Sequence, residues 1–178
     1  MDKPSGSKPF DIVLYGRNDP KAKKEGCEFL VSIGKYTLGI PIEKQGEHYQ
    51  RGDVILIRIE DGVEVGMEAE RKEVWKKSGM WETANWDTVD VPFRKHTSEA
   101  KIFIMFNEAW DTLAITQMET ILKKDKNGKF KFKGWKKETT YTKDEPFFKV
   151  PLMCWRFFKR DEENPEKWVE ITYNGELV

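Results

Sequence analysis

The chain contains 178 residues with a mass of 21.0 kDa, and 31 lysine and arginine residues balance 31 aspartate and glutamate residues. The zero net charge excludes a uniformly basic nucleic-acid-coating protein and an acidic solvating chain. Aromatic residues make up 13% of the chain, which is typical of a folded protein. The length predicts a single domain over residues 10–178, preceded by a flexible polar arm at residues 1–9.

The sequence has the features of a cytoplasmic protein. Cys27 and Cys154 lie far apart, which favours two reduced thiols over a disulfide. The first seven residues are polar and lack the apolar segment of a signal peptide. Apolar runs reach about five residues, against the roughly 20 that span a bilayer. We therefore expect a cytoplasmic protein without a membrane segment.

The first elements expected along the chain are a short strand and a helix. Residues 10–15 (FDIVLY) predict the strand. Asp19 and Pro20 are typical of the N-cap and first position of a helix. We expect this helix over about residues 21–33, ending at Gly34.

A β-hairpin is the clearest local prediction that follows. Residues 53–59 (DVILIRI) are apolar on both faces and predict a buried strand. Asp61-Gly62 is a strong signal for a two-residue hairpin turn. Residues 64–72 (EVGMEAERK) return as the second strand, and a helical or loop segment with three tryptophans follows.

Further strands are expected in the rest of the chain, at residues 88–93, 101–107, 112–117 and 168–172. Between them lies a lysine-rich stretch at residues 118–145, in which Asn127-Gly128 is another hairpin signal. Helical, hairpin and strand patterns in this order predict a mixed α/β or α+β domain.

The predicted hairpin gathers acidic side chains. With a two-residue turn, Ile55 faces Glu68 and Asp53 faces Glu70, with opposed Cβ atoms about 4.5–5.5 Å apart. Because side chains alternate along a strand, Glu68, Glu70 and Lys72 share the face of Asp53. Opposed carboxylates repel, so either one of them binds a proton or a cation lies between them.

A divalent cation at this position would support phosphodiester hydrolysis. Mg²⁺ binds one or two carboxylates together with waters and phosphate oxygens. Lys72 beside such an ion would hold or polarise the attacking water, and the metal would neutralise the charge that develops on the phosphate.

Asp53, the short hairpin and Glu70-Arg71-Lys72 resemble the Asp…(Asp/Glu)-x-Lys signature of the PD-(D/E)XK nuclease superfamily. The resemblance implies a restriction-endonuclease-like core over about residues 19–117, in which a central mixed sheet is flanked by helices. Residues 118–178 would add a β segment rich in lysine and aromatic residues. The implied activity is metal-dependent hydrolysis of DNA.

The resemblance also implies a set of metal ligands. Asp53 and Glu70 would hold Mg²⁺ or Mn²⁺, and Glu68 is an alternative or additional ligand and catalytic carboxylate. Members of this superfamily often add an acidic residue from the first helix, which would be Glu28 or Glu25 here. Cleavage of duplex DNA by this superfamily implies a homodimer or two sites.

Cationic residues around the motif are the candidates for nucleic-acid contacts. They are Arg94 and Lys95 at a strand end, Lys76 and Lys77 after the hairpin, and Lys131 and Lys133 in the lysine-rich stretch. Lysines interleaved with aromatic residues suit backbone contacts and base stacking. The alternative is a non-catalytic module that binds nucleic acid or protein through a hairpin at residues 123–143. The alternating pattern of this stretch also fits an ordinary solvated hairpin on the protein surface. No glycine-rich nucleotide-binding loop is present, so we expect no nucleotide cofactor.

Overall fold

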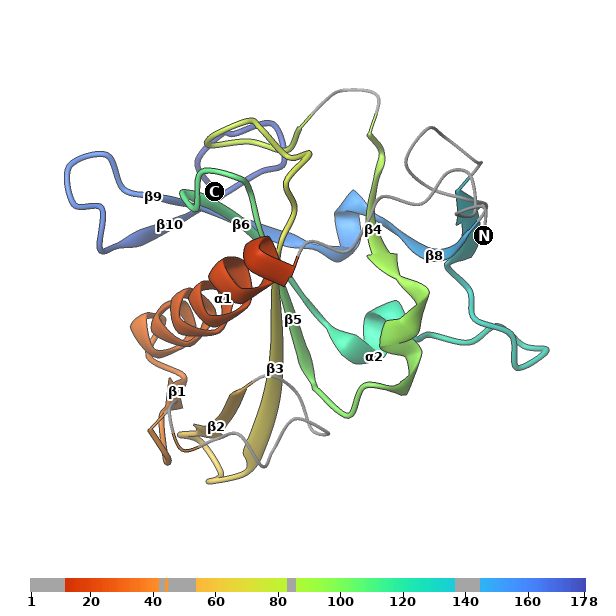
Figure 1. Cartoon of the computed structure of the whole chain (residues 1–178), viewed down its shortest axis with the longest axis horizontal. Coiled ribbons are helices and arrows are strands. Elements are labelled where there is room, and N and C mark those ends of the chain that lie inside the picture. Colours follow the sequence, from red (N-terminus) through yellow and green to blue (C-terminus); the bar gives the residue numbers. More distant parts are fainter. Residues whose placement is uncertain (1–11, 42–43, 45–53, 83–85, 137–144) are drawn as a thin grey trace.

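The computed structural model describes residues 12–41, 44, 54–82, 86–136 and 145–178 (Figure 1). The elements in chain order are α1 (Ile12–Ser32), β1 (Tyr36–Thr37), β2 (Val54–Arg58), β3 (Glu64–Arg71), β4 (Thr88–Pro92), η3 (Phe93–Thr97), β5 (Ile102–Phe106), β6 (Thr112–Gln117), α2 (Met118–Ile121), β7 (Lys133–Lys136), β8 (Glu145–Pro151), η4 (Leu152–Cys154), β9 (Arg156–Arg160) and β10 (Trp168–Ile171). The mixed α/β class predicted from the sequence is confirmed.

The described strands form two sheets. Seven strands make the larger sheet, in the order β1-β2-β3-β5-β6-β9-β10, and β4, β8 and β7 make a smaller antiparallel sheet. In the larger sheet β3 and β5 are parallel, and the other described neighbours are antiparallel. Parallel neighbours need a crossover connection, and the chain between β3 and β5 makes it by way of β4 in the smaller sheet.

The larger sheet is covered on both faces, by α1 on one side and by the smaller sheet on the other (Figure 1). Its central strand β5 is buried on both faces. Ile102, Ile104 and Phe106 belong to the core under α1, whereas Phe103 and Met105 belong to the core under the smaller sheet. A side chain on β3 or β5 therefore reaches one of two separate interiors, according to its position in the alternation.

The start of α1 differs from the prediction. Residues 12–15 are helical, and the helix continues through Pro20 instead of beginning there. A short apolar run does not by itself distinguish a strand from a helix, and a proline removes one backbone donor without necessarily ending a helix. The predicted end is confirmed, because Gly34 has a φ of 76° and its N–H donates to the Val31 carbonyl at 3.0 Å. The predicted arm and the first two residues of the predicted strand lie outside the described residues.

The hairpin of β2 and β3 is present, but its pairing is shifted by two residues from the prediction. Ile55 pairs with Gly66 and not with Glu68. A two-residue shift leaves every side chain on the face expected for it, whereas a one-residue shift would reverse the faces. Glu68 and Glu70 therefore share one face of β3, as predicted. Asp53, which was expected opposite Glu70, lies outside the described residues.

The hairpin loop explains the shift. The loop has four residues, 59–62, and the Arg58 N–H closes it by donating to the Val63 carbonyl at 2.9 Å. The Arg58 guanidinium pairs with the Asp61 carboxylate at 2.6 Å, and Gly62 adopts a φ of 70°. Asp61 and Gly62 thus form the end of a longer loop and not the centre of a two-residue turn.

The chain between β3 and β5 departs from the core that the resemblance implies. Its described residues form loops, β4 and η3 where a flanking α-helix was expected. Two tryptophans of this segment, Trp75 and Trp81, are buried against each other with ring centroids 4.8 Å apart. The segment therefore contributes to the core between the sheets while it carries the chain across.

The lysine-rich stretch does not form one long hairpin. Its predicted turn is present, with a φ of 77° at Gly128 and the Asp125 carboxylate accepting from the Asn127 N–H at 2.8 Å. Beyond a single bridge between Lys124 and Phe130, however, the chain continues into β7, which pairs with β8. The remaining part of the hairpin predicted to end at residue 143 lies outside the described residues.

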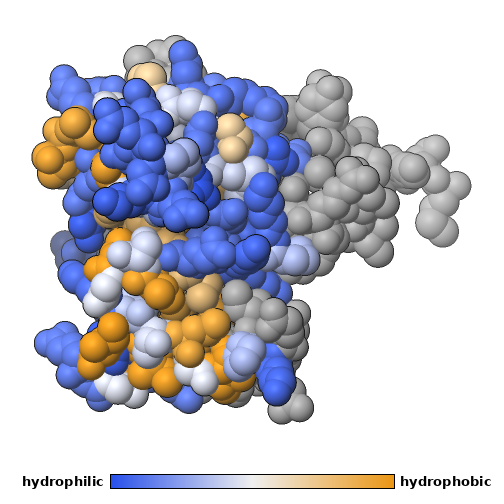
Figure 2. Space-filling view, turned by 90° about the vertical axis from the view of Figure 1, so that its left-hand side faces the viewer, coloured by the Kyte–Doolittle hydropathy of each residue, from blue (hydrophilic) through white to orange (hydrophobic). Residues whose placement is uncertain are grey.

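The surface beside α1 and β1 is uneven in polarity. Hydrophilic side chains dominate the upper part of this face, and apolar side chains gather in the lower part, at the level of β1 and β2 (Figure 2). Exposed apolar residues include Val31 at the end of α1, Ile59 in the hairpin loop and Val63 directly after it. Within the described ranges, no helix combines the length and apolarity that crossing a bilayer requires.

Candidate active site

Two glutamates lie side by side on the inner face of β3. Glu68 and Glu70 alternate with Met67 and Ala69, which pack into the core under α1. The parallel register places Glu68 opposite Phe103 of β5, on the face that meets the smaller sheet. The Glu68 side chain is 12% exposed and the Glu70 side chain is 24% exposed. These two carboxylates are therefore largely removed from water and need a compensating charge.

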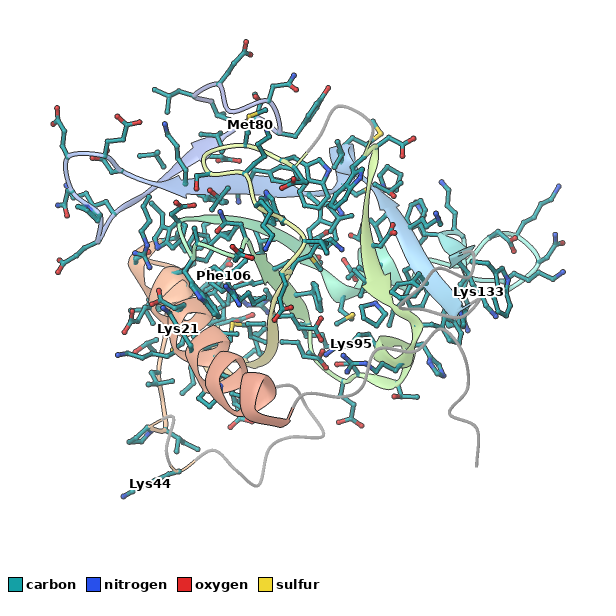
Figure 3. All side chains as sticks on the ribbon, turned by 45° about the horizontal axis from the view of Figure 1, so that its top comes forward. Lys21, Lys44, Met80, Lys95, Phe106 and Lys133 are labelled. Atoms are coloured by element: carbon teal, nitrogen blue, oxygen red, sulfur yellow. The ribbon has the colours of Figure 1, made fainter. Side chains whose placement is uncertain are left out.

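Lys95 supplies that charge. It belongs to η3, which begins where Pro92 ends β4. Its Nζ atom lies 2.7 Å from Oε1 of Glu70 and also contacts Oε2 of Glu68. The Lys95 side chain is 11% exposed, and its Nζ atom is 5.9 Å from the ring centroid of Phe103. Figure 3 shows Lys95 in the interior, where β4 runs into η3.

Two further side chains complete what we call the carboxylate–lysine cluster, which comprises Glu68, Glu70, Arg94, Lys95 and Ser98. The exposed Arg94 guanidinium lies 3.3 Å from Oε1 of Glu70, and the Ser98 hydroxyl donates to Oε1 of Glu68. The formal charges of the two glutamates and the two cations cancel. Sequence reasoning missed Ser98, which no local pattern connects to β3.

The protonation of Lys95 follows from its neighbours. Burial alone would lower the pKa of Lys95, but the charges of Glu70 and Glu68 and their hydrogen bonds more than offset this effect. The pKa of Lys95 is consequently raised above its ordinary value. Lys95 is an ammonium at neutral pH, which makes it a hydrogen-bond donor and not a base.

Among the described residues, the lysine that contacts Glu68 and Glu70 is Lys95, whereas the sequence motif pointed to Lys72. The Lys72 backbone N–H continues the sheet by donating to the Phe106 carbonyl at 2.8 Å, and its Nζ atom lies 5.9 Å from the ring centroid of Trp86. Lys95, which the sequence suggested as a phosphate contact, takes the place beside the glutamates.

The two glutamates that the resemblance suggested on the first helix, Glu25 and Glu28, do not join the cluster. Helix α1 covers the opposite face of β3, where Met67 and Ala69 point. On that helix Glu25 pairs with Arg160 of β9, and Glu28 is 58% exposed with its Oε1 atom 3.9 Å from Nζ of Lys24. The prediction that Glu28 or Glu25 contributes to the same metal shell as Glu68 and Glu70 is therefore not met by this arrangement.

The cluster contains suitable oxygen donors for a metal ion, although few of them. In the part of the chain that the structure describes, no three His, Cys, Asp or Glu side chains gather closely enough to hold a metal. Glu68 and Glu70 supply carboxylate oxygens of the kind that Mg²⁺ prefers, and Mg²⁺ sites often use one or two carboxylates with waters. These two carboxylates therefore fit such an ion. In this structure both of them contact the Lys95 ammonium.

The other predicted nucleic-acid contacts lie in two places. The Lys76 ammonium pairs with Glu108, and the Lys77 backbone N–H donates to Glu82 at 2.9 Å. Lys131 and Lys133 lie on the exposed surface that leads into β7, and each has its ammonium near an aromatic ring. Of the predicted contacts, only Arg94 and Lys95 contact the two glutamates.

The whole chain was compared with protein-family models, with curated proteins and with solved structures. None of the three comparisons finds a match. The resemblance to PD-(D/E)XK nucleases therefore stays a prediction from the sequence, based on Asp53, the hairpin and Glu70-Arg71-Lys72.

Proposed function

We propose that this protein is a metal-dependent nuclease whose active site is the carboxylate–lysine cluster. The observation that supports the proposal is the contact of the Lys95 ammonium with both Glu68 and Glu70 on the inner face of β3. Two carboxylates and an ammonium are the groups that the PD-(D/E)XK motif combines. In this proposal Lys95 takes the role that the sequence motif assigns to Lys72.

Glu68 and Glu70 would hold Mg²⁺ or Mn²⁺, together with Asp53 as the sequence predicts. When bound, such an ion neutralises charge on the scissile phosphate and makes water more acidic. Lys95 would keep its contact with one carboxylate and turn its ammonium towards the phosphate, which its flexible four-carbon stem permits. Because the pKa of Lys95 is raised, its role would be to donate a hydrogen bond to the phosphate or the attacking water.

The rim of the cluster suits an anionic substrate. Arg94 is exposed, and its guanidinium faces Glu70 from the solvent side of the cluster. A guanidinium in this position can bind a phosphate oxygen with two donors. Arg94 would therefore hold the phosphodiester backbone next to the reacting phosphate.

A cleavage assay tests the proposal. Supercoiled plasmid, single-stranded DNA and a branched DNA substrate are incubated with the purified chain in Mg²⁺, in Mn²⁺ and in excess EDTA. We expect cleavage in at least one metal and none in EDTA. Glu70→Gln and Glu68→Gln should each lower the rate by about 10²–10³-fold, because each removes a charged ligand worth several kcal/mol.

Matched variants locate the site. Glu28→Gln removes an exposed carboxylate from α1 and should leave the rate unchanged, while Asp53→Asn should abolish cleavage. Lys95→Met should lower the rate more than Lys72→Met. Circular dichroism establishes that each variant is folded. Absence of cleavage by the folded wild type on every substrate, or wild-type rates in both Glu68 and Glu70 variants, would overturn the proposal.

A second candidate function is a nucleic-acid-binding module without catalytic activity. It is favoured by the charge balance of the cluster, because Lys95 and Arg94 already compensate the two glutamates. This alternative predicts binding that EDTA does not change and no cleavage with any divalent metal.

A further inference from the structure

A second group of side chains lies on the other side of η3 from the carboxylate–lysine cluster. We call it the lysine–aromatic surface, and it comprises Phe93, His96, Phe130, Lys133 and Trp135. The Lys133 Nζ atom lies 4.5 Å from the ring centroid of Phe93 and 6.0 Å from that of Trp135. His96 stacks on Phe93 with ring centroids 4.5 Å apart, and Phe130 meets Phe93 edge-on at 5.9 Å.

Trp135 is the unusual member of this surface. All seven tryptophans of the chain lie in described residues, and Trp135, which is 62% exposed, is the only one in the exposed class. It lies on β7, one of the two edge strands of the smaller sheet. On β7, Lys133 pairs with the buried Phe148, and Trp135, two residues further along, pairs with Pro146. Trp135 therefore lies on the same face of the smaller sheet as Phe148, but outside the buried core. An exposed indole at this position is free to stack with a ligand.

The surrounding charge is positive. Six lysines between residues 123 and 133 are exposed: Lys123, Lys124, Lys126, Lys129, Lys131 and Lys133. Within the described ranges none of the six pairs with a carboxylate. Asp125, the acidic residue among them, accepts backbone N–H groups of its own turn. A polyanion would therefore meet unpaired ammonium groups here.

The element η3 joins this surface to the proposed active site. Arg94 and Lys95 of η3 contact the glutamates, whereas Phe93 and His96 of the same short element belong to the lysine–aromatic surface. Figure 3 shows Lys95 in the interior and Lys133 further out on the side of the smaller sheet. A polynucleotide at the glutamates could thus continue over η3 onto β7.

We propose that the lysine–aromatic surface binds a single-stranded segment of nucleic acid, with a base stacked on Trp135 and phosphates held by Lys133 and the neighbouring lysines. Stacking on an exposed indole requires an unpaired base, whereas lysines alone would serve a duplex equally well. The consequence for catalysis, which rests on the proposed nuclease function, is a preference for substrates with an unpaired strand beside the scissile phosphate.

Binding is measured in EDTA, where no cleavage can occur. Fluorescence anisotropy follows labelled single-stranded DNA, single-stranded RNA and a blunt duplex of equal length at several salt concentrations. We expect the wild type to bind a single strand more tightly than the duplex. Comparison of the affinities for single-stranded DNA and single-stranded RNA shows which of the two it prefers. Trp135→Ala should weaken single-strand binding by about tenfold to a hundredfold, and Trp135→Phe should retain most of it.

Lys126→Ala is the matched control for Lys133→Ala. Both variants remove one exposed lysine from the same stretch, but Lys126 is in the turn and contacts no ring among the described residues. We expect Lys133→Ala to weaken single-strand binding more than Lys126→Ala. Equal losses in the two variants would overturn the assignment of phosphate contact to Lys133.

The outcomes separate this proposal from the nuclease proposal. Single-strand binding that depends on Trp135 supports the surface, even if the chain cleaves nothing. Unchanged binding by Trp135→Ala, or tighter binding of the duplex by the wild type, overturns the surface even if the chain is an active nuclease.

Discussion

The two faces of β3 carry different kinds of side chain. On the outer face, Met67 and Ala69 are buried under α1, which approaches so closely that a Cβ atom at Gly26 would lie 2.9 Å from Met67 Sδ. On the inner face, Glu68 and Glu70 are charged and are compensated by Lys95. One strand thus packs apolar side chains on one face and carries two carboxylates paired with a lysine on the other. The outer face depends on shape, whereas the inner face depends on a cation delivered from another part of the chain.

The largest expected effect on stability comes from the outer face. Phe29 of α1 is fully buried and meets Phe158 edge-on at 4.9 Å. Phe29→Ala should lower the free energy of unfolding by about 3–5 kcal/mol, because it removes buried surface and leaves a cavity. Urea denaturation measures this loss. A loss below about 1 kcal/mol would show that the interior under α1 is not closely packed.

An intermediate effect is expected on the inner face. Lys95→Met leaves two largely buried carboxylates without their ammonium and should lower the free energy of unfolding by on the order of 1–3 kcal/mol. Arg94→Met removes an exposed partner of the same glutamate and should change it by about 0.5 kcal/mol or less. Equal losses in the two variants would contradict a difference between the buried and the exposed cation.

The Lys95 contribution also has a defined pH dependence. Because the folded-state pKa of Lys95 is raised, its stabilisation is fully present below its ordinary pKa of 10.5 and is lost as the pH rises through the raised value. The difference in stability between wild type and Lys95→Met should therefore be constant from neutral pH to about pH 10 and shrink above that range. A difference that shrinks between pH 7 and 9 would contradict this assignment.

The smallest expected difference between the two cores is in the chemical reactivity of their thiols. Cys27 is buried in the core under α1, and burial, with a smaller contribution from Glu28, raises its pKa to about 11. Cys154 is partly exposed beside the other core. Iodoacetamide at pH 8 should modify Cys154 first, and Cys27 only on unfolding, since the thiolate is the reactive form. Mass spectrometry of the alkylated peptides identifies the order, and faster reaction of Cys27 would contradict it.

Local sequence patterns determined much of this protein. The alternation of apolar and acidic residues on β3 placed Glu68 and Glu70 on one face, and an even shift in pairing left that result unchanged. The strand at residues 112–117 and the glycine that follows α1 were also predicted correctly. These features depend on neighbours within a few residues, whose periodicity and backbone preferences can be recognised in the sequence.

Tertiary structure decided the remaining features, because they depend on contacts between distant segments. Residues 12–15 suit a helix as well as a strand, and their helical form depends on context. The choice of Lys95 over Lys72 follows from the parallel pairing of β3 with β5, whose crossover carries η3 to the glutamates. No spacing in the sequence encodes that contact. The sequence specified the two carboxylates and their common face, and the path of the chain selected the cation that neutralises them.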